Sequence, residues 1–500
     1  MKKHFYLLLL PFLLLSLNTF AQSWKWAYTA HTTPRSQSVA IKEDHSGNFY
    51  LATFTDSITT RLYTTLEKHD ANQQMLWQKQ ITGDVTISDI EINAANHAIA
   101  VGYFKGNISV DGNPLTSFSP ADNSGFIFEC DESGMIIWVH DLNPVNGDFK
   151  PGELYIALNG DMYITSQVSG NFGFCAFHQL DASGNIIKNE FNNNFENRTF
   201  SHILTDADNN VYLSGTCGFG ANFDSIAANP NFSYQNFLVK YDSSFKAQWL
   251  ITREYVTFDD NNGIGTDGQS LYWAFNEFTS NADTSRIIKC DYNGQITNSI
   301  DGPLSAAFFP AIDFKVDRLG NSVLLLNTFV RFFIYRYDPA LNMVWQDTIY
   351  TNTSGFPLNA GLTCYDSSFY LTSFYQKDTL LIDNFTLINP NTTGNYRTDI
   401  FVAKWSNNQV PVSVNETQNN HLLHVFPIPS GNEIHVTGLQ SESGDVIKMF
   451  DASGKMIISD PIKSSALFID ISGLSNGIYF LKLMSADNLV KTAAKIVKMH

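Results

Sequence analysis

Residues 39–54 read VAIKEDHSGNFYLATF, and this stretch decides the fold. An apolar segment leads into a turn of Asp, Ser, Gly and Asn, and an aromatic segment follows. Short apolar and aromatic segments around such a turn predict two β-strands joined as a hairpin. The pattern returns six more times, at residues 90–104, 154–166, 203–215, 264–275, 314–329 and 362–374.

A second pattern alternates with the first: an apolar segment, a turn led by Asp, and a segment that often carries Trp. Its copies lie at residues 66–77, 126–138, 177–187, 237–249, 287–297 and 333–345, with a truncated copy, IFVAKW, at 400–405. The aromatic position of the first pattern recurs at steps of 50, 63, 49, 60, 52 and 46 residues. A period near fifty residues that holds four strands is typical of a β-propeller blade.

We therefore predict an all-β chain with two folded parts. Residues 22–405 form a seven-bladed β-propeller with four strands per blade. Residues 406–424 are polar and form a linker. Residues 425–500 carry short strands separated by Gly, Asp and Ser turns, which predicts a small β-sandwich.

The two ends of the repeat region complement each other. The last copy of the second pattern lacks its final strand, because polar residues follow position 405. Residues 23–30, SWKWAYTA, carry Trp where the final strands of other repeats carry it. We predict that residues 24–30 pair antiparallel with residues 399–405, which closes the ring and buries Trp24 or Trp26. The alternative is a disordered mature N-terminus.

An Asp side chain at the start of such a turn stabilises it, because the carboxylate accepts a hydrogen bond from the backbone N–H two residues further along. Calcium binding is the alternative for Asp206-x-Asp208-x-Asn210, which has the opening spacing of a calcium loop but lacks its central Gly and downstream Glu. We expect turns, no metal and no cofactor. The residues that lead these turns are Asp44, Asp131, Asp181, Asp206, Asp291 and Asp317.

The five cysteines predict neither a disulfide framework nor a zinc site, since their number is odd and no CxxC is present. We expect buried thiols outside disulfides at Cys130, Cys175, Cys217, Cys290 and Cys364.

The N-terminus has the pattern of a secretory signal peptide over residues 1–21. Lys2 and Lys3 precede an apolar run, and Thr19-Phe20-Ala21 offers small residues for cleavage, so Gln22 is the expected mature start. No later stretch predicts a transmembrane helix. The net charge of −17 disfavours nucleic acid and anionic lipid as partners.

Two resemblances follow from these residues. The repeats resemble bacterial propeller repeats with D-x-x-G-N-x-Y segments, related in style to NHL and kelch arrays. Residues 425–500 are similar to the type A C-terminal sorting domain of the Bacteroidota type IX secretion system. That resemblance implies delivery to the cell surface or the medium, with the secretion machinery at the outer membrane as partner. The matching residues are Pro427, Pro429, Asp451, Gly454, Asp470, Leu474, Gly477, Tyr479, Lys495 and Lys498. The opening motif departs from the family, with Phe-Pro-Ile-Pro at residues 426–429 in place of Tyr-Pro-Asn-Pro.

No match to a catalytic or cofactor-binding motif lies in the predicted secondary structure that the motif requires. Gly263-x-Gly265-x-x-Gly268 has dinucleotide spacing but is followed by a predicted strand where that motif needs a helix. We therefore expect a non-catalytic propeller that binds an extracellular protein or glycan. The alternative is an extracellular carbohydrate- or peptide-active enzyme that uses the funnel of the ring. Carboxylates clustered with His or Arg at one point of that funnel favour the enzyme.

Overall fold

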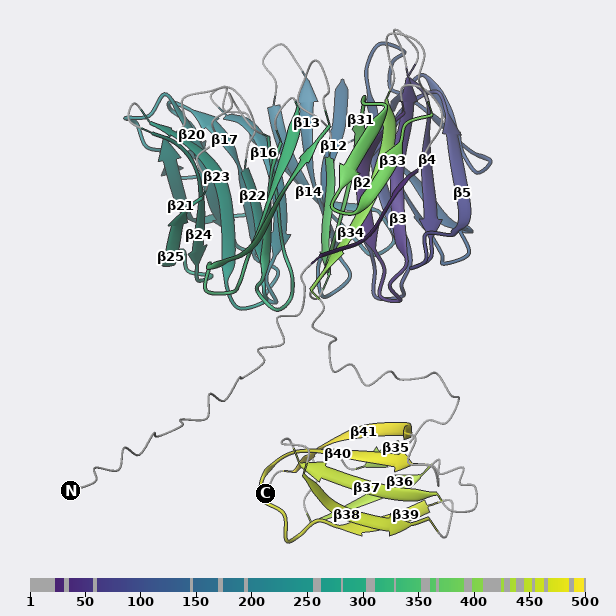
Figure 1. Cartoon of the computed structure of the whole chain (residues 1–500). Helices are drawn as coiled ribbons and strands as arrows, with labels where there is room; N and C mark the ends of the chain where they lie inside the picture. The colour runs from purple at the N-terminus through teal and green to yellow at the C-terminus, as the bar shows by residue number, and fades with distance from the viewer. Residues whose placement is uncertain are drawn as a thin grey trace, which may run out of the picture. The chain divides into compact units, whose positions relative to one another are not determined.

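The computed structural model describes residues 23–30, 36–56, 61–143, 147–169, 174–192, 197–254, 262–279, 282–302, 311–327, 330–351, 360–365, 368–390, 398–407, 424–426, 432–437, 445–451, 455–462, 466–484 and 490–498. The chain divides into two compact units, Met1–Asn408 and Gln409–His500. The predicted signal peptide and residues 408–423 of the predicted linker lie outside the described residues. Each unit is described by itself (Figure 1).

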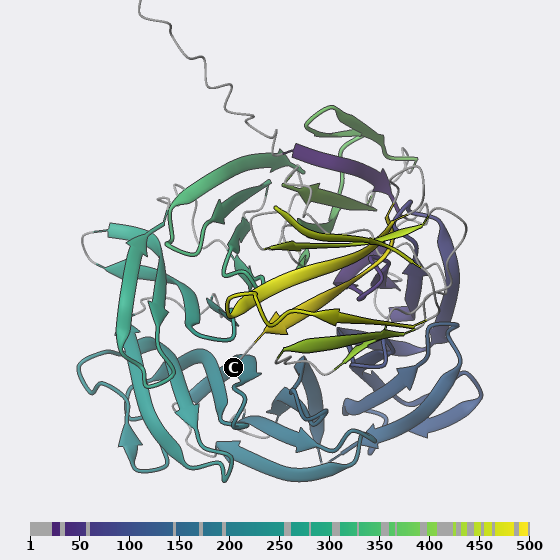
Figure 2. The same cartoon turned by 90° about the horizontal axis from the view of Figure 1, so that it is seen from below.

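The first unit is built from four-stranded antiparallel sheets, the arrangement typical of propeller blades. Figure 2 shows these sheets following one another around a common centre. Six of them use four strands in chain order, interrupted in two cases by a hairpin described below. Three of the six are β2 (Ser36–Glu43), β3 (Phe49–Asp56), β4 (Arg61–His69) and β5 (Met75–Thr82); β6 (Asp84–Ile92), β7 (Ala98–Lys105), β10 (Ser124–Cys130) and β11 (Ile136–Leu142); and β12 (Asp148–Ile156), β13 (Met162–Ser169), β14 (Phe174–Leu180) and β15 (Ile186–Asn192). The others are β16 (Asn197–Thr205), β17 (Val211–Gly218), β20 (Tyr234–Tyr241) and β21 (Ala247–Glu254); β22 (Asn262–Thr266), β23 (Leu271–Thr279), β24 (Ala282–Cys290) and β25 (Ile296–Asp301); and β26 (Ala311–Val316), β27 (Ser322–Asn327), β28 (Arg331–Tyr337) and β29 (Met343–Tyr350).

The seventh four-stranded sheet of this unit joins both ends of the chain segment. It has the order β1-β34-β31-β30, from β1 (Ser23–Thr29), β34 (Asp399–Ser406), β31 (Ser368–Tyr375) and β30 (Ala360–Tyr365). Ser23 pairs with Ser406 and Thr29 with Phe401, so the predicted antiparallel pairing of residues 24–30 with 399–405 is confirmed. Trp24 is 4% exposed and its Nε1–H donates to Asp347 Oδ2 at 2.6 Å. We call this pairing of β1 with β34 the clasp.

The Asp-led turns work as predicted. In each, one carboxylate oxygen accepts hydrogen bonds from the backbone N–H groups two and four residues further along, as Asp44 does from Ser46 and Asn48 at 2.8 and 2.9 Å. Asp206 does the same, and its second oxygen accepts from Asn210 Nδ2 and Tyr212 OH at 2.8 Å each. The same pair of backbone bonds occurs at Asp131, Asp181, Asp291 and Asp317.

Neighbouring sheets pack face to face. The Trp side chain of a fourth strand packs against the next sheet and forms a hydrogen bond with it. Trp77 of β5 donates its Nε1–H to the carbonyl of Glu132 at 2.9 Å. Gly134 of the same turn has φ +85° and lies under the indole, where a Cβ atom would come within 2.9 Å of the ring. Only glycine fits both the backbone angle and the space. The apolar clusters likewise span adjacent sheets, as that of β2–β4 with β6, β7 and β10 does.

Three further hairpins were not predicted. Each lies between the second and third strand of a four-stranded sheet: β8 (Asn107–Val110) with β9 (Asn113–Thr116), β18 (Asn222–Phe223) with β19 (Ile226–Ala227), and β32 (Thr379–Ile382) with β33 (Phe385–Ile388). The first two account for the long repeat steps of 63 and 60 residues. The third follows the last repeated aromatic position, so no step reveals it.

The second unit contains two antiparallel sheets. One has the order β35-β36-β39 and the other β38-β37-β40-β41. Their strands are β35 (His424–Phe426), β36 (Glu433–Thr437), β37 (Val446–Asp451), β38 (Met456–Pro461), β39 (Ala466–Asp470), β40 (Gly477–Met484) and β41 (Val490–Lys498). Side chains of both sheets share one apolar core, with Ile434 and Val436 from the first and Ile447, Leu481 and Ile496 from the second.

The remaining global predictions concern cysteines and membrane spans. The five cysteines form no disulfide; four are buried and Cys364 is half-buried. Within the described ranges, no helix has the length and hydrophobicity that a membrane crossing requires.

Candidate functional site

In the first unit, one channel is lined by the innermost strand of each four-stranded sheet: β2, β6, β12, β16, β22, β26 and β30. Three cavities of about 520, 250 and 230 Å³ lie along these strands and share lining residues. The largest, which we call the channel mouth, shares Ser88, Gly152 and Asp313 with the second cavity. The second shares Asp89, Glu153 and Lys315 with the third. The cavities are therefore successive levels of one channel.

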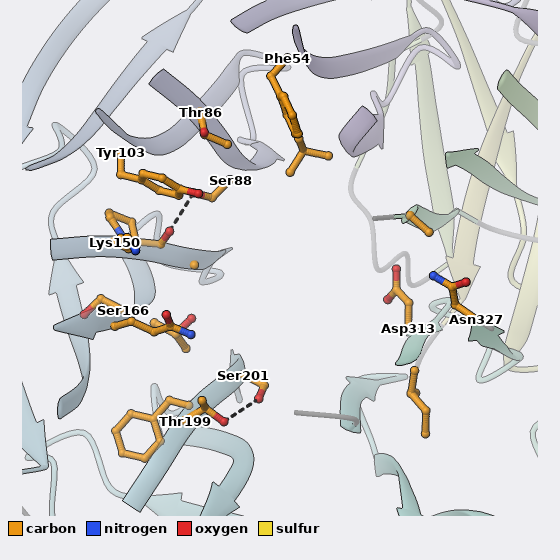
Figure 3. A pocket seen from close by; sticks show the side chains of 18 of the residues that line it. Phe54, Thr86, Ser88, Tyr103, Lys150, Ser166, Thr199, Ser201, Asp313 and Asn327 are labelled. Atoms are coloured by element: carbon orange, nitrogen blue, oxygen red, sulfur yellow. Dashed lines mark hydrogen bonds between the residues drawn. The ribbon is translucent and has the colours of Figure 1, made fainter. Parts of the chain in front are cut away.

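Hydroxyl or amide side chains account for nine of the twenty residues that line the channel mouth. Figure 3 shows Asp313 and Asn327 on the wall opposite Tyr103, Ser88 and Lys150. Ser88 Oγ–H donates to the carbonyl of Pro151 at 2.8 Å, which ties β6 to β12 (Figure 3). The buried Thr86 Oγ1 has no hydrogen-bond partner among the described residues. A buried hydroxyl without a partner is unusual in a folded protein.

Two cations and three aromatic rings complete the mouth. The Arg61 guanidinium lies 3.8 Å from the centre of the Phe54 ring and 5.9 Å from that of Tyr103. Lys150 Nζ also lies 5.9 Å from the Tyr103 ring. These residues come from β4, β3, β7 and β12, so three sheets supply them. Phe200 lines the cavity further along.

Below the mouth, five charged or titratable residues meet. We call Asp89, Glu153, His202, Asp313 and Lys315 the mid-channel cluster; all five line the second cavity. Glu153 Oε1 lies 3.1 Å from His202 Nδ1 and 3.2 Å from Lys315 Nζ. Its Oε2 accepts from the backbone N–H of Ile203 at 2.8 Å. Glu153 of β12 is thus bonded to β16 and to β26.

Within the cluster the pKa values of Asp89 and Asp313 are raised, whereas that of Glu153 is lowered. Burial, together with the charges of Glu91 and Glu153, raises the pKa of Asp89 to about 7. Burial also raises the pKa of Asp313. For Glu153, burial acts upward too, but the charges of His202 and Lys315 outweigh it and lower the pKa to about 2. Burial would lower the pKa of His202, and the charge of Glu153 raises it instead.

The cluster also has a repeating structural role. Asp89 Oδ2 accepts from the backbone N–H of Leu154 at 2.9 Å, and Glu153 makes the corresponding bond to Ile203. Each acid thereby fixes the first strand of the next sheet. Sequence reasoning missed these residues, although a signal was present: Asp89, Glu153, His202 and Asp313 directly precede the copies of the first pattern at Ile90, Leu154, Ile203 and Phe314.

In the second unit, five of the predicted motif residues gather at one turn. Asp470 Oδ1 accepts from the backbone N–H of Ser472 at 2.8 Å, and Leu474 N–H donates to the carbonyl of Ile471 at 3.0 Å. Tyr479 OH donates to the carbonyl of Ser475 at 2.7 Å. Lys498 is 2% exposed, and its Nζ donates to the carbonyl of Ile471 at 2.7 Å. Gly477 begins β40 directly after this turn.

The other motif residues are placed less closely or not at all. Asp451 ends β37, where its Oδ1 accepts from the backbone N–H of Lys455 at 3.0 Å. Lys495 lies in β41. Pro427, Pro429 and Gly454 lie outside the described residues.

Residues 424–499 match the family described as the secretion system C-terminal sorting domain. The chain carries a type IX secretion sorting domain. A sorting domain of this kind directs its protein to the cell surface or the medium through the type IX machinery. A comparison with curated proteins found no match.

Solved structures similar to the chain include propellers with different roles. PorZ, an essential surface component of the type IX secretion system of Porphyromonas gingivalis, is 11% identical with a TM-score of 0.31, covering 92% of this chain and 59% of that chain. The propeller domain of the trilobed protease from Pyrococcus furiosus is 9% identical, with a TM-score of 0.40 and coverage of 72% and 97%. An ulvan lyase is 10% identical, with a TM-score of 0.41 and coverage of 76% and 94%. At these identities none of the three assigns a function to this chain.

Among the residues that the structure describes, no three His, Cys, Asp or Glu side chains are placed to hold a metal ion together.

Proposed function

We propose that the chain is an exported, seven-bladed β-propeller that binds an extracellular protein or glycan at the channel mouth without catalysing a reaction. In this proposal residues 1–21 are a signal peptide, 22–405 the propeller, 406–424 a linker and 425–500 a β-sandwich sorting domain. The seven four-stranded sheets of the first unit and the apolar core shared by two sheets in the second support this division.

The observation that carries the binding role is the composition of the channel mouth. Its volume of about 520 Å³ falls in the range of small-ligand sites. Its walls present hydroxyl, amide and cationic groups from several sheets, and Thr86 Oγ1 and Arg61 Nη1 have no hydrogen-bond partner among the described residues. Polar donors held by rigid strands favour selective binding at little entropic cost.

The binding role is tested with the mature full-length protein and an array of extracellular glycans and surface proteins. A Ser88→Trp variant fills the mouth and should abolish every specific signal. Binding that survives in this variant would place the ligand elsewhere on the protein and contradict the proposal. Deleting the exposed Asp208 side chain, as Asp208→Ala, is the matched control and should change nothing.

An enzyme remains the second candidate because the mid-channel cluster brings carboxylates and a histidine to one point. Asp89 with its raised pKa could donate a proton, and the ionised Glu153 beside Lys315 could stabilise positive charge. The strand-to-strand bonds of both acids favour a structural role instead. Turnover of any saccharide or peptide by the wild type, lost in Asp89→Asn and Glu153→Gln, would favour the enzyme.

The roles of the motif residues in sorting are part of the proposal. Asp470, Leu474, Gly477, Tyr479 and Lys498 surround one turn, which supports their acting as one recognition element. Deleting residues 425–500 should leave a folded propeller in the periplasm. Unimpaired release of that truncated protein into the medium would contradict the sorting role.

A further inference from the structure

Two cations meet on one ring at the mouth of a strongly acidic protein. The net charge is −17, yet Arg61 from β4 and Lys150 from β12 both approach the Tyr103 ring of β7 to 5.9 Å. Arg61 is held further by the Phe54 ring, 3.8 Å away. Stacking on aromatic faces fixes the direction of a guanidinium group without using its N–H donors.

The acidic neighbours of these cations do not use up their donors. Arg61 Nε lies 3.8 Å from Asp56 Oδ1, and Lys150 Nζ lies 3.6 Å from Asp148 Oδ2. Both distances exceed that of an N–H···O hydrogen bond. Within the described part of the chain, Arg61 Nη1 is buried and has no hydrogen-bond partner. A buried guanidinium N–H without an acceptor is costly, so an acceptor is expected to reach it.

The rest of the mouth suits hydroxyl groups. Asp313 and Asn327 stand on the opposite wall, and Thr86 Oγ1 and Ser88 lie on the side of the cations (Figure 3). Carboxylate and amide oxygens accept from sugar hydroxyls, and the threonine hydroxyl can donate to them. Among the apolar side chains of the lining, Phe54, Phe200 and Leu325 are 2%, 5% and 1% exposed, whereas Val39 is half-buried. The mouth therefore offers polar groups together with some apolar surface.

We propose that the channel mouth binds a saccharide carrying an isolated acidic group, with the carboxylate or sulfate of that group on Arg61 and Lys150 and the sugar hydroxyls toward Asp313, Asn327 and Thr86. This inference rests on the proposed binding function and names its ligand class. The net charge of −17 repels polyanions, so a single charge on an otherwise neutral saccharide fits better than a uniformly charged polymer.

The test compares matched probes on the mature full-length protein. Binding of galactotriose is measured by calorimetry against a trisaccharide of the same length with one terminal galacturonate. The acidic trisaccharide should bind at least tenfold more tightly at low salt. Acetate and inorganic sulfate, which carry the charge without the sugar, should compete only weakly.

Variants of Arg61 and Lys150 then test whether these two cations cause the preference for the acidic trisaccharide. Arg61→Met and Lys150→Met keep most of each aliphatic stem, and each should reduce the preference severalfold, while the double variant should bind both trisaccharides equally. Lys79→Met is the control, because Lys79 pairs with Asp111 at 2.8 Å on an outer strand and faces no part of the mouth. Unchanged melting temperatures exclude misfolding as the cause.

Three results would overturn the inference, and they can be told apart. Equal binding of the neutral and the acidic trisaccharide by the wild type would be consistent with the binding function but would contradict recognition of the acidic group. Absence of binding to any saccharide, combined with capture of a protein partner that Ser88→Trp abolishes, would retain the binding function and remove the saccharide. Free sulfate binding as tightly as the acidic trisaccharide would reduce the site to a simple anion site.

Discussion

The channel mouth and the mid-channel cluster share strands and even lining residues, yet they treat their polar atoms differently. In the cluster, Glu153 accepts bonds from His202, Lys315 and the backbone of the next strand. At the mouth, Thr86 Oγ1 and Arg61 Nη1 lack partners in the described part of the chain. The mid-channel cluster holds the sheets together, and the mouth is the level at which the function proposed above places the ligand. Closeness of charges alone therefore does not distinguish a structural level of the channel from a candidate binding level.

The largest effect should come from breaking the cluster. Glu153→Gln removes the charge nearest to Lys315 and His202, and leaves Asp313, 4.0 Å from Lys315 Nζ, as the remaining partner of Lys315 in the cluster. We expect a loss of about 2–3 kcal/mol in the free energy of unfolding, measured by urea titration. Asp208→Asn, an exposed acid in a turn, should change it by less than about 0.5 kcal/mol. Equally small losses of unfolding free energy in both variants would contradict a structural role for the mid-channel cluster and hence its difference from the mouth.

A pH series should show a smaller effect of the cluster through Asp89. Its folded pKa of about 7 is raised above the unfolded value near 3.8. A raised pKa means that the folded state binds the proton more tightly, so this stability is full below pH 4 and is lost as the pH rises toward 7. Asp89→Asn should flatten the decline of the melting temperature between pH 4 and 7. An unchanged pH profile in this variant would contradict the raised pKa.

The smallest effects should come from the mouth. Ser88→Ala removes the hydrogen bond to Pro151 and should cost about 1 kcal/mol, measured by urea titration. Thr86→Val replaces an unpartnered buried hydroxyl with a methyl group of similar shape and should be neutral or slightly stabilising. A clear loss in Thr86→Val would mean that this hydroxyl has a structural partner and that the mouth is not set apart for a ligand.

Much of the fold could be predicted because its signals are local and repeated. The Asp-led turns mark the hairpins, and the unmatched Trp-bearing segment at residues 23–30 predicts the clasp. The inserted hairpins were missed because, in place of the repeated pattern, they show only short segments such as NISVDGNPLT at 107–116. The channel residues were missed for a different reason. Asp89 and Lys315 are far apart in the chain, and only the curvature of the sheet array brings their strands together.

The clasp sets an order of events during export. Ser23 of β1 follows the predicted mature start by one residue, and its partner Ser406 is the last residue of β34. A chain that enters the periplasm N-terminus first therefore holds an unpaired edge until almost the whole propeller has followed. Pairing of β1 with β34 therefore requires that nearly all of the first unit has been translocated, whereas the six other four-stranded sheets of that unit are built from strands close together in the chain.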